Sequence, residues 1–166
     1  EDVRPMGRGA RGVRGMKLQD GQAVISLLVA EDDQQTVLVA TENGFGKRTV
    51  LADFRHSGRG TQGVKAIADS ERNGVVIAAK LVNDDDEVML ITTGGVLIRT
   101  RVSEIRGMGR AMQGVTLIAL DDGEKLAGLE KVAESVGDAG AEVADELADM
   151  PAEGDTDAVA GEAEEN

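Results

Sequence analysis

The residues best suited to chemistry in this sequence are arginines that recur at fixed positions in a glycine-rich phrase. The phrase is ten residues long, starts with Arg and ends with Gly-Val; its copies at residues 4–13, 55–64 and 106–115 are called here the first, second and third recurring loops. Successive copies start 51 residues apart. Arginine presents a planar fork of donors that suits phosphate, and glycine lets backbone N–H groups approach a ligand closely. The pattern therefore predicts a surface that binds a phosphate polyanion.

The basic residues gather in and beside these loops. The predicted contact residues are Arg4, Arg8, Arg11, Arg14, Lys17, Lys47, Arg48, Arg55, Arg59, Lys65, Arg99, Arg101, Arg106 and Arg110. The acidic residues of the same part of the chain cluster at residues 31–33 and 84–87, and we expect these clusters to lie away from the basic surface. Phe45 and Phe54 are the only aromatic residues, which gives single-stranded bases little to stack on. Duplex DNA, held by its phosphates and bent across the loops, is the ligand that fits best.

Other chemistry finds little support. His56 is the only histidine and the chain has no cysteine, so we expect neither a metal site nor a catalytic triad. The acidic run 84–87 could hold a hard cation, but the aligned segment 33–36 lacks its charge density, and a solvated turn is the preferred interpretation. We expect no catalytic residue and no cofactor in this chain.

The elements that must position the loops repeat with them. Aligning residues 4–54 with 55–105 without a gap gives 13 identical positions. Short apolar and alternating runs predict strands over 23–29, 36–41, 47–51, 64–68, 75–82, 87–92, 96–102 and 115–119, with a further strand near 125–129. Hairpin turns are predicted at 31–35, 42–44, 83–86 and 93–95. About four strands per repeat is typical of propeller blades, so the fold class expected is all-β, with equivalent loops on one rim.

The charge is divided unevenly along the chain. The net charge is −13, but residues 1–120 carry a net +1 and residues 121–166 a net −14. We expect blades over residues 1–136 and a disordered acidic tail over residues 137–166. The sequence shows no signal peptide or membrane span, which favours a soluble, cytoplasmic protein. Because the chain opens inside the first recurring loop, and three blades close a ring poorly, we expect further blades upstream.

Several motifs together resemble a known family. They are the Arg-x-x-Gly-Arg-x-x-x-Gly-Val loops, the segment Thr41–Thr49, the motif Glu71–Gly74 and the segment Ile98–Ile105. In this order and spacing they resemble the carboxyl-terminal domain of bacterial DNA gyrase A, over essentially all of residues 1–136. The resemblance implies the last three blades of a six-bladed β-pinwheel that wraps duplex DNA and so enables ATP-dependent negative supercoiling by a type II topoisomerase. It also implies gyrase B as a partner in the whole enzyme, with ATP and Mg bound elsewhere.

The family's loop pattern carries over residue by residue, with one departure. Its matching positions are Arg4, Gly7, Arg8, Gly12, Arg55, Gly58, Arg59, Gly63, Arg106, Gly109, Arg110 and Gly114. The family's defining first-blade box, Gln-Arg-Arg-Gly-Gly-Lys-Gly, is absent, and the chain has no tyrosine for DNA cleavage. The matching domain of topoisomerase IV and a propeller-like protein-interaction scaffold remain the alternatives. The acidic tail could also compete with DNA for the basic rim, because attachment gives it a high effective concentration.

Overall fold

The computed structural model describes residues 3–133, and the regular secondary structure of this range is almost entirely strand. The strands are β1 (Thr36–Thr41), β2 (Phe45–Val50), β3 (Val76–Val82), β4 (Glu87–Thr92), β5 (Leu97–Arg101), β6 (Val115–Thr116) and β7 (Leu126–Lys131). Two short 3-10 helices, η1 (Leu51–Asp53) and η2 (Val102–Glu104), follow β2 and β5. They lie 51 residues apart, so the sequence repeat is also a structural repeat.

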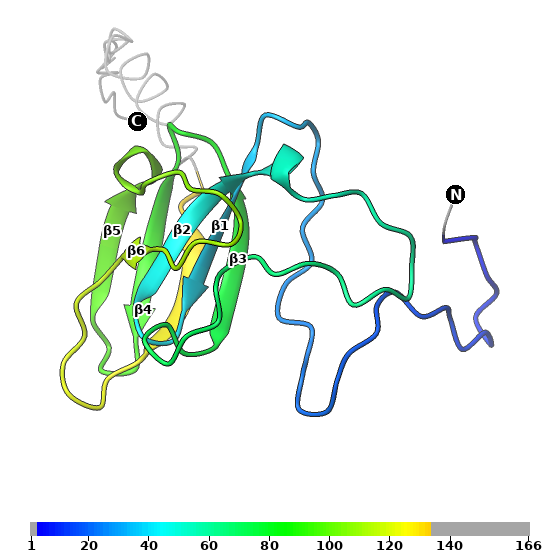
Figure 1. Ribbon diagram of the computed structural model, residues 1–166, viewed down its shortest axis with the longest axis horizontal. Coiled ribbons are helices and arrows are strands. Elements are labelled where there is room, and N and C mark those ends of the chain that lie inside the picture. Colours follow the sequence, from blue (N-terminus) through cyan, green and yellow to red (C-terminus); the bar gives the residue numbers. More distant parts are fainter. Residues whose placement is uncertain (1–2, 134–166) are drawn as a thin grey trace, which may run out of the picture. The chain divides into compact units, whose positions relative to one another are not determined.

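The strands form two antiparallel sheets (Figure 1), one in the order β3-β1-β2-β6 and the other in the order β5-β4-β7. In the first sheet β1 pairs with β2 through the turn at 42–44, and with β3 across about 40 residues of chain. The second sheet repeats this arrangement, because β4 pairs with β5 and with β7. A blade therefore takes its hairpin from one repeat and its next strand from the following repeat.

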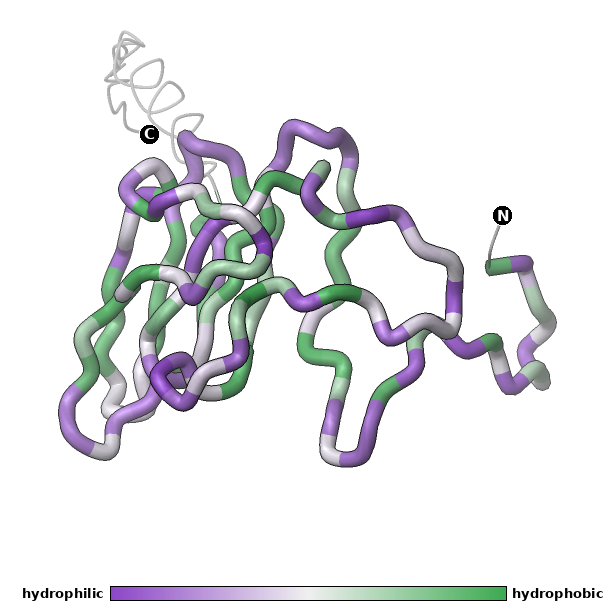
Figure 2. The backbone as a smooth tube through the Cα atoms, in the orientation of Figure 1, coloured by the Kyte–Doolittle hydropathy of each residue, from purple (hydrophilic) through white to green (hydrophobic). Residues whose placement is uncertain are grey.

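The main core lies between the two sheets. Its buried residues are Leu38, Ala40, Ala78, Val82, Val88, Leu90, Val102, Ile105, Ile118, Leu126 and Leu129. Successive side chains of a strand point to opposite faces, and β1 is buried on both. Leu38 and Ala40 enter the main core, whereas Val37 and Val39 form a second cluster with Ile67. Hydrophobic stretches lie along the strands and hydrophilic ones at the turns between them (Figure 2).

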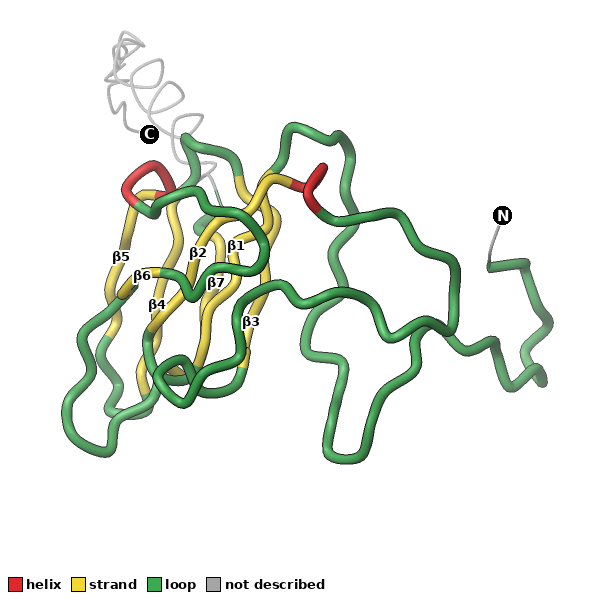
Figure 3. The backbone as a smooth tube through the Cα atoms, viewed as in Figure 1, coloured by secondary structure: helices red, strands yellow, loops and turns green. Residues whose placement is uncertain are grey.

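Three of the predicted strands differ in the structure. Residues 23–29 and 64–68 are not strands, and only Val115–Thr116 of the run 115–119 is paired. Residues 3–35, which precede β1, are drawn as loop (Figure 3). Residues 23–29 largely align with β3, and β3 is held by β1 of the preceding repeat; the described residues hold no strand in the corresponding place for 23–29. A strand needs a neighbouring strand to pair with its backbone N–H and C=O groups. Residues 23–29 have no such neighbour among the described residues, so they do not form a strand.

Two of the four predicted hairpin turns do not connect paired strands, so these two predictions are wrong. The turn at 83–86 closes with a hydrogen bond from Asp86 N to Asn83 O, but it joins β3 to β4, which lie in different sheets. The turn at 31–35 precedes β1 and follows a segment that is not a strand. The turns at 42–44 and 93–95 do form hairpins, with Gly44 at φ 80° and Gly95 at φ 84°.

Within the described range, no helix is long and apolar enough to cross a membrane. The acidic tail predicted over residues 137–166 lies outside the described residues.

Candidate nucleic-acid interface

The second and third recurring loops each contact the segment that follows the preceding loop. The backbone N–H of Lys17, just after the first loop, donates to the carbonyl of Thr61 in the second at 2.9 Å. One repeat later, Ala68 N donates to Met112 O in the third loop at 3.2 Å. Residues 17 and 68, and residues 61 and 112, are each 51 apart, so the same contact occurs twice. The structure thus brings the three loops into one series, as equivalent positions of a repeat require.

The third loop also docks on the edge of the first sheet. Met108 N donates to Arg48 O at 2.8 Å, and Arg48 N donates to Arg106 O at 3.4 Å. This parallel bridge extends β2 beyond its short pairing with β6. A strand of the first repeat therefore holds the loop that opens the third repeat.

The recurrence of glycine has a conformational cause at one position of each loop. Gly12, Gly63 and Gly114 have φ angles of 80°, 75° and 87°. This left-handed region is costly for residues that carry a Cβ atom. At Gly114 a Cβ atom would also lie 2.6 Å from the carbonyl oxygen of Gly46 on β2. Glycine is therefore needed there for the loop to reach the sheet.

Nine of the fourteen predicted contact residues lie at or near the surface with no carboxylate of residues 3–133 within ion-pair distance. They are Arg4, Arg8, Arg11, Arg14, Lys17, Arg55, Arg59, Arg106 and Arg110. All are exposed except Arg110, which is half-buried and donates to the Lys65 carbonyl at 3.2 Å. Their charges are the ones available to an external anion.

Four others are paired with acids. Two of these pairs correct the expectation that the acidic turn lies away from the basic residues: Arg48 pairs with Asp84, and Arg99 pairs with Glu87. The first pairing follows from the sheet order. Thr36 on β1 faces both Val50 and Val82, so the end of β3 and the acids after it meet the end of β2.

The remaining paired residues do not involve the acidic turn. Lys65 pairs with Asp69, and Arg101 lies 3.7 Å from Glu104. Both pairs are exposed, and exposed pairs are weak enough for a phosphate to compete with them.

Lys47 is the clearest departure from the predicted contact surface. Its side chain is fully buried, so it does not reach an external phosphate in this structure. Its ammonium donates to the Thr49 hydroxyl at 3.0 Å and to two carbonyls of the third loop, those of Gly109 and Arg110, each at 2.8 Å. Burial lowers the pKa of Lys47, the nearby Arg110 charge lowers it further, and Asp53 partly opposes both.

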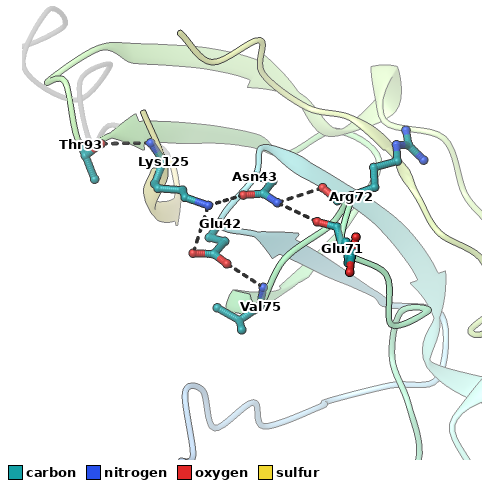
Figure 4. Close-up of polar contacts among 7 residues, drawn as sticks. All are labelled: Glu42, Asn43, Glu71, Arg72, Val75, Thr93 and Lys125. Atoms are coloured by element: carbon teal, nitrogen blue, oxygen red, sulfur yellow. Dashed lines mark hydrogen bonds and ion pairs between the residues drawn. The ribbon is translucent and has the colours of Figure 1, made fainter. Parts of the chain in front are cut away.

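A polar cluster joins the turns of the two sheets (Figure 4). Lys125, just before β7, donates to the Asn43 side-chain oxygen at 2.5 Å and lies 3.5 Å from Glu42. The Asn43 amide in turn donates to the carbonyls of Glu71 at 3.2 Å and Arg72 at 3.0 Å. These contacts connect three segments that are far apart in sequence, and their role is to fix blade against blade.

Sequence reasoning missed three residues that hold the loops and blades in place. Thr49 donates to the Met108 carbonyl at 2.9 Å, and buried Asn73 donates to the Gln113 carbonyl at 2.9 Å. Thr49 belongs to an Arg-Thr pair that recurs 51 residues later, and Asn73 to an Asn-Gly turn, so both had a signal in the repeat. Lys125 had none, because its aligned residue is Gly74.

Comparison with known proteins gives a consistent result. A family model described as the DNA gyrase C-terminal domain, beta-propeller, matches residues 1–31, 35–83 and 86–133. The DNA gyrase A protein of Pseudomonas aeruginosa is 55% identical over 135 residues, which is 81% of this chain and 14% of that protein. The DNA gyrase A protein of Escherichia coli is 46% identical over 153 residues, 92% of this chain and 17% of that protein. The chain thus spans between about one seventh and one sixth of the length of these relatives.

Solved structures agree on the fold. A DNA gyrase A C-terminal domain superposes with a TM-score of 0.72 at 29% identity, covering 80% of this chain and 45% of that one. The C-terminal domain of DNA topoisomerase IV gives a TM-score of 0.75 at 23% identity, covering 90% and 46%. The second match shows a shared fold alone. The all-β, blade-repeating fold class expected from the sequence is confirmed.

Proposed function

The chain belongs to the DNA gyrase C-terminal domain family, and from this premise we propose that it is a non-catalytic module that binds and wraps duplex DNA. The observation that carries the proposal is the series of recurring loops. The second and third loops contact the segments that follow the preceding loop, in the same register, and the loop arginines have no carboxylate partner among the described residues. A row of unpaired guanidinium groups at repeated spacing suits the regular phosphates of a duplex.

The loops would act through phosphates and not through base edges. Phosphate contacts fix the position of a protein on DNA without reading its sequence, so we expect binding to be largely sequence-independent. Loops that follow one another around successive blades would hold the duplex along a curved path, and sequence would enter only through the cost of bending. The single pair of phenylalanines leaves no platform for stacking single-stranded bases.

In the whole enzyme, the wrapped segment would be presented to a strand-passage core carried by the rest of gyrase A. We propose gyrase B as the further partner, and ATP hydrolysis, Mg binding and DNA cleavage as steps of those other parts. The chain has no tyrosine to form a covalent link to DNA. The setting proposed is the bacterial cytoplasm, on the chromosome, with blades over residues 1–136 and an acidic tail over residues 137–166.

Two alternatives remain. The equivalent domain of topoisomerase IV shares the fold, but the gyrase A relatives at 46% and 55% identity favour gyrase. A protein-interaction scaffold would carry mixed charges on its loops. The loop arginines, which pair with no carboxylate of residues 3–133, favour a polyanion instead.

The test is DNA topology after relaxation in the presence of the chain. A closed circular plasmid is bound, relaxed by a nicking-closing enzyme, and deproteinised. Wrapping leaves a trapped change in linking number, whereas binding without wrapping leaves none. We expect the change to fall sharply for Arg55→Gln combined with Arg106→Gln. The charge-matched control is Lys80→Gln combined with Lys131→Gln, two lysines already paired with Glu130 and Asp86, and it should retain most of the effect.

A further inference from the structure

The carbonyl groups of the third recurring loop turn toward the body of the protein. Arg106 O accepts from the Arg48 backbone N–H, and Met108 O accepts from the Thr49 hydroxyl. Gly109 O and Arg110 O both accept from Lys47. Further along, Met112 O accepts from Ala68 N, and Gln113 O accepts from the Asn73 amide. Donors of the body therefore satisfy most carbonyls from residue 106 to residue 113.

Met108 N and Met112 N of the same loop donate to Arg48 O and Gly109 O, but several other N–H groups of the loop have no acceptor among residues 3–133. The backbone N–H groups of Gly107, Gly109, Ala111 and Gln113 donate to no acceptor among residues 3–133, and all four residues are exposed. A run of unpaired N–H groups carries partial positive charge and binds anions. The loop is thus polarised, with its negative dipole ends toward the sheet and its positive ends available to solvent.

Lys47 is the group that can impose this polarity. Its side chain is charged and fully buried. Its ammonium donates to the carbonyl oxygens of two successive loop residues, Gly109 and Arg110. Hydrogen bonds from a charged donor are about twice as strong as neutral ones. Burying an unpaired ammonium is very costly, so the loop carbonyls and the lysine depend on each other.

We propose that Lys47 is a positioning residue for DNA binding: by holding the carbonyls of Gly109 and Arg110, it keeps the third loop in the conformation that offers its N–H groups and the guanidinium groups of Arg106 and Arg110 to phosphate. This inference rests on the proposed function, since it assigns a role within the same interface. Lys47 itself makes no contact with the DNA.

The hydrogen bonds from Lys47 and Thr49 to the carbonyls of the third loop are called here the clamp. The hairpin of the next repeat lacks them. The residue aligned with Lys47 is Ile98, and the residue aligned with Thr49 is Thr100. Ile98 is 39% exposed, and Thr100 makes no side-chain hydrogen bond among the described residues. The clamp therefore belongs to the third loop and is not a general feature of the hairpins, which provides matched controls.

The experiment measures the salt dependence of duplex binding by the 166-residue chain between about 50 and 200 mM salt, where each phosphate contact contributes about 0.9 to the slope of log K against log salt. Arg106→Gln combined with Arg110→Gln should lower the slope by about 1.8. Lys47→Met should lower it by about the same amount, and should cause no further loss when added to the two arginine substitutions. A loss of only about 0.9 that adds to the arginine losses would mean direct contact, and would overturn the proposal.

A second pair of variants covers the case in which Lys47→Met fails to fold. Thr49→Val removes no charge but two hydrogen bonds, one from Lys47 to the Thr49 hydroxyl and one from that hydroxyl to Met108 O. It should lower the slope, whereas Thr100→Val should leave it unchanged. Equal slopes for these two variants would overturn the positioning role. Two other results would count against DNA binding by the third loop itself, and not only against the role of Lys47. The first is duplex binding by the unmodified chain that does not depend on salt. The second is equally tight binding by the double arginine variant and the unmodified chain.

Discussion

Replacing Gly114 with alanine should uncouple the third recurring loop from the first sheet. The residue has φ 87°, and an added Cβ atom would lie 2.6 Å from Gly46 O, 3.0 Å from Gly46 C and 3.3 Å from the Ile67 side chain. Real Cβ atoms do not approach a backbone oxygen so closely, so either the loop or β2 must move. Gly46 cannot yield easily, because it is paired with Ala40 of β1 on one side and with Val115 of β6 on the other.

The expected cost has two parts. The left-handed backbone costs an alanine about 1–2 kcal/mol, and forcing an extra carbon into a packed contact costs about 1–3 kcal/mol. The free energy of unfolding should therefore fall by about 2–5 kcal/mol. Thermal unfolding followed by circular dichroism measures it, since about 1 kcal/mol shifts the Tm of a domain of this size by roughly 3–6 °C.

The chain supplies its own control in Gly63, the same position one repeat earlier. Its φ is 75°, but the nearest atom to an added Cβ is the Met16 methyl carbon at 3.9 Å. Gly63→Ala should therefore cost only the backbone part, about 1–2 kcal/mol. Equal shifts of Tm for the two substitutions would refute the idea that close approach to β2 fixes the third loop.

Three further predictions concern charge. Arg106→Gln should weaken duplex binding more than Arg99→Gln in a filter-binding assay, because Arg99 already pairs with Glu87; a larger loss at Arg99 would contradict this. Because the pKa of Lys47 is lowered by burial and by Arg110, with Asp53 in opposition, the unfolded chain binds the extra proton at alkaline pH. The free energy of unfolding should therefore rise relative to that of Lys47→Met as pH climbs toward the ordinary lysine pKa, and denaturant melts at several pH values would reveal a flat difference if this is wrong. Ending the chain near Gly137 should strengthen duplex binding at low salt, measured by fluorescence anisotropy, and unchanged affinity would argue against a competing tail.

The sequence was sufficient to predict the strands of the two hairpins, but not which other strands pair with those hairpins. The alternation in 36–41 and 87–92, with Gly44 and Gly95 at the turns, predicted β1, β2, β4 and β5 within a few residues. Alternation does not say which strand lies alongside, however. The turn at 83–86 looked like a hairpin because both flanking strands were correct, yet β3 pairs with β1, about 40 residues upstream.

The candidate site was predictable where it depends on the repeat and not where it depends on pairing between repeats. The arginines of the recurring loops are without a carboxylate partner in the described part of the chain, and most are exposed. Arg48, Arg99 and Lys47 carry the same charge but face Asp84, Glu87 and loop carbonyls. Asp84 and the loop carbonyls come from segments that only a knowledge of strand order places beside β2, whereas Glu87 and Arg99 lie on the two strands of the predicted hairpin β4–β5. A basic residue beside a loop can belong to its support as well as to its contact surface.

The blade arrangement gives this distinction a physical basis. In the first sheet, β1 and β2 come from one repeat, β3 from the next, and the docked third loop and β6 from the one after. Stability in repeat proteins depends on interfaces between neighbouring units. Here the third recurring loop itself forms part of the interface with β2. A substitution in β2, such as one at Thr49, therefore acts on a loop 59 residues away in sequence. The position of the third recurring loop is therefore set by a strand of another repeat.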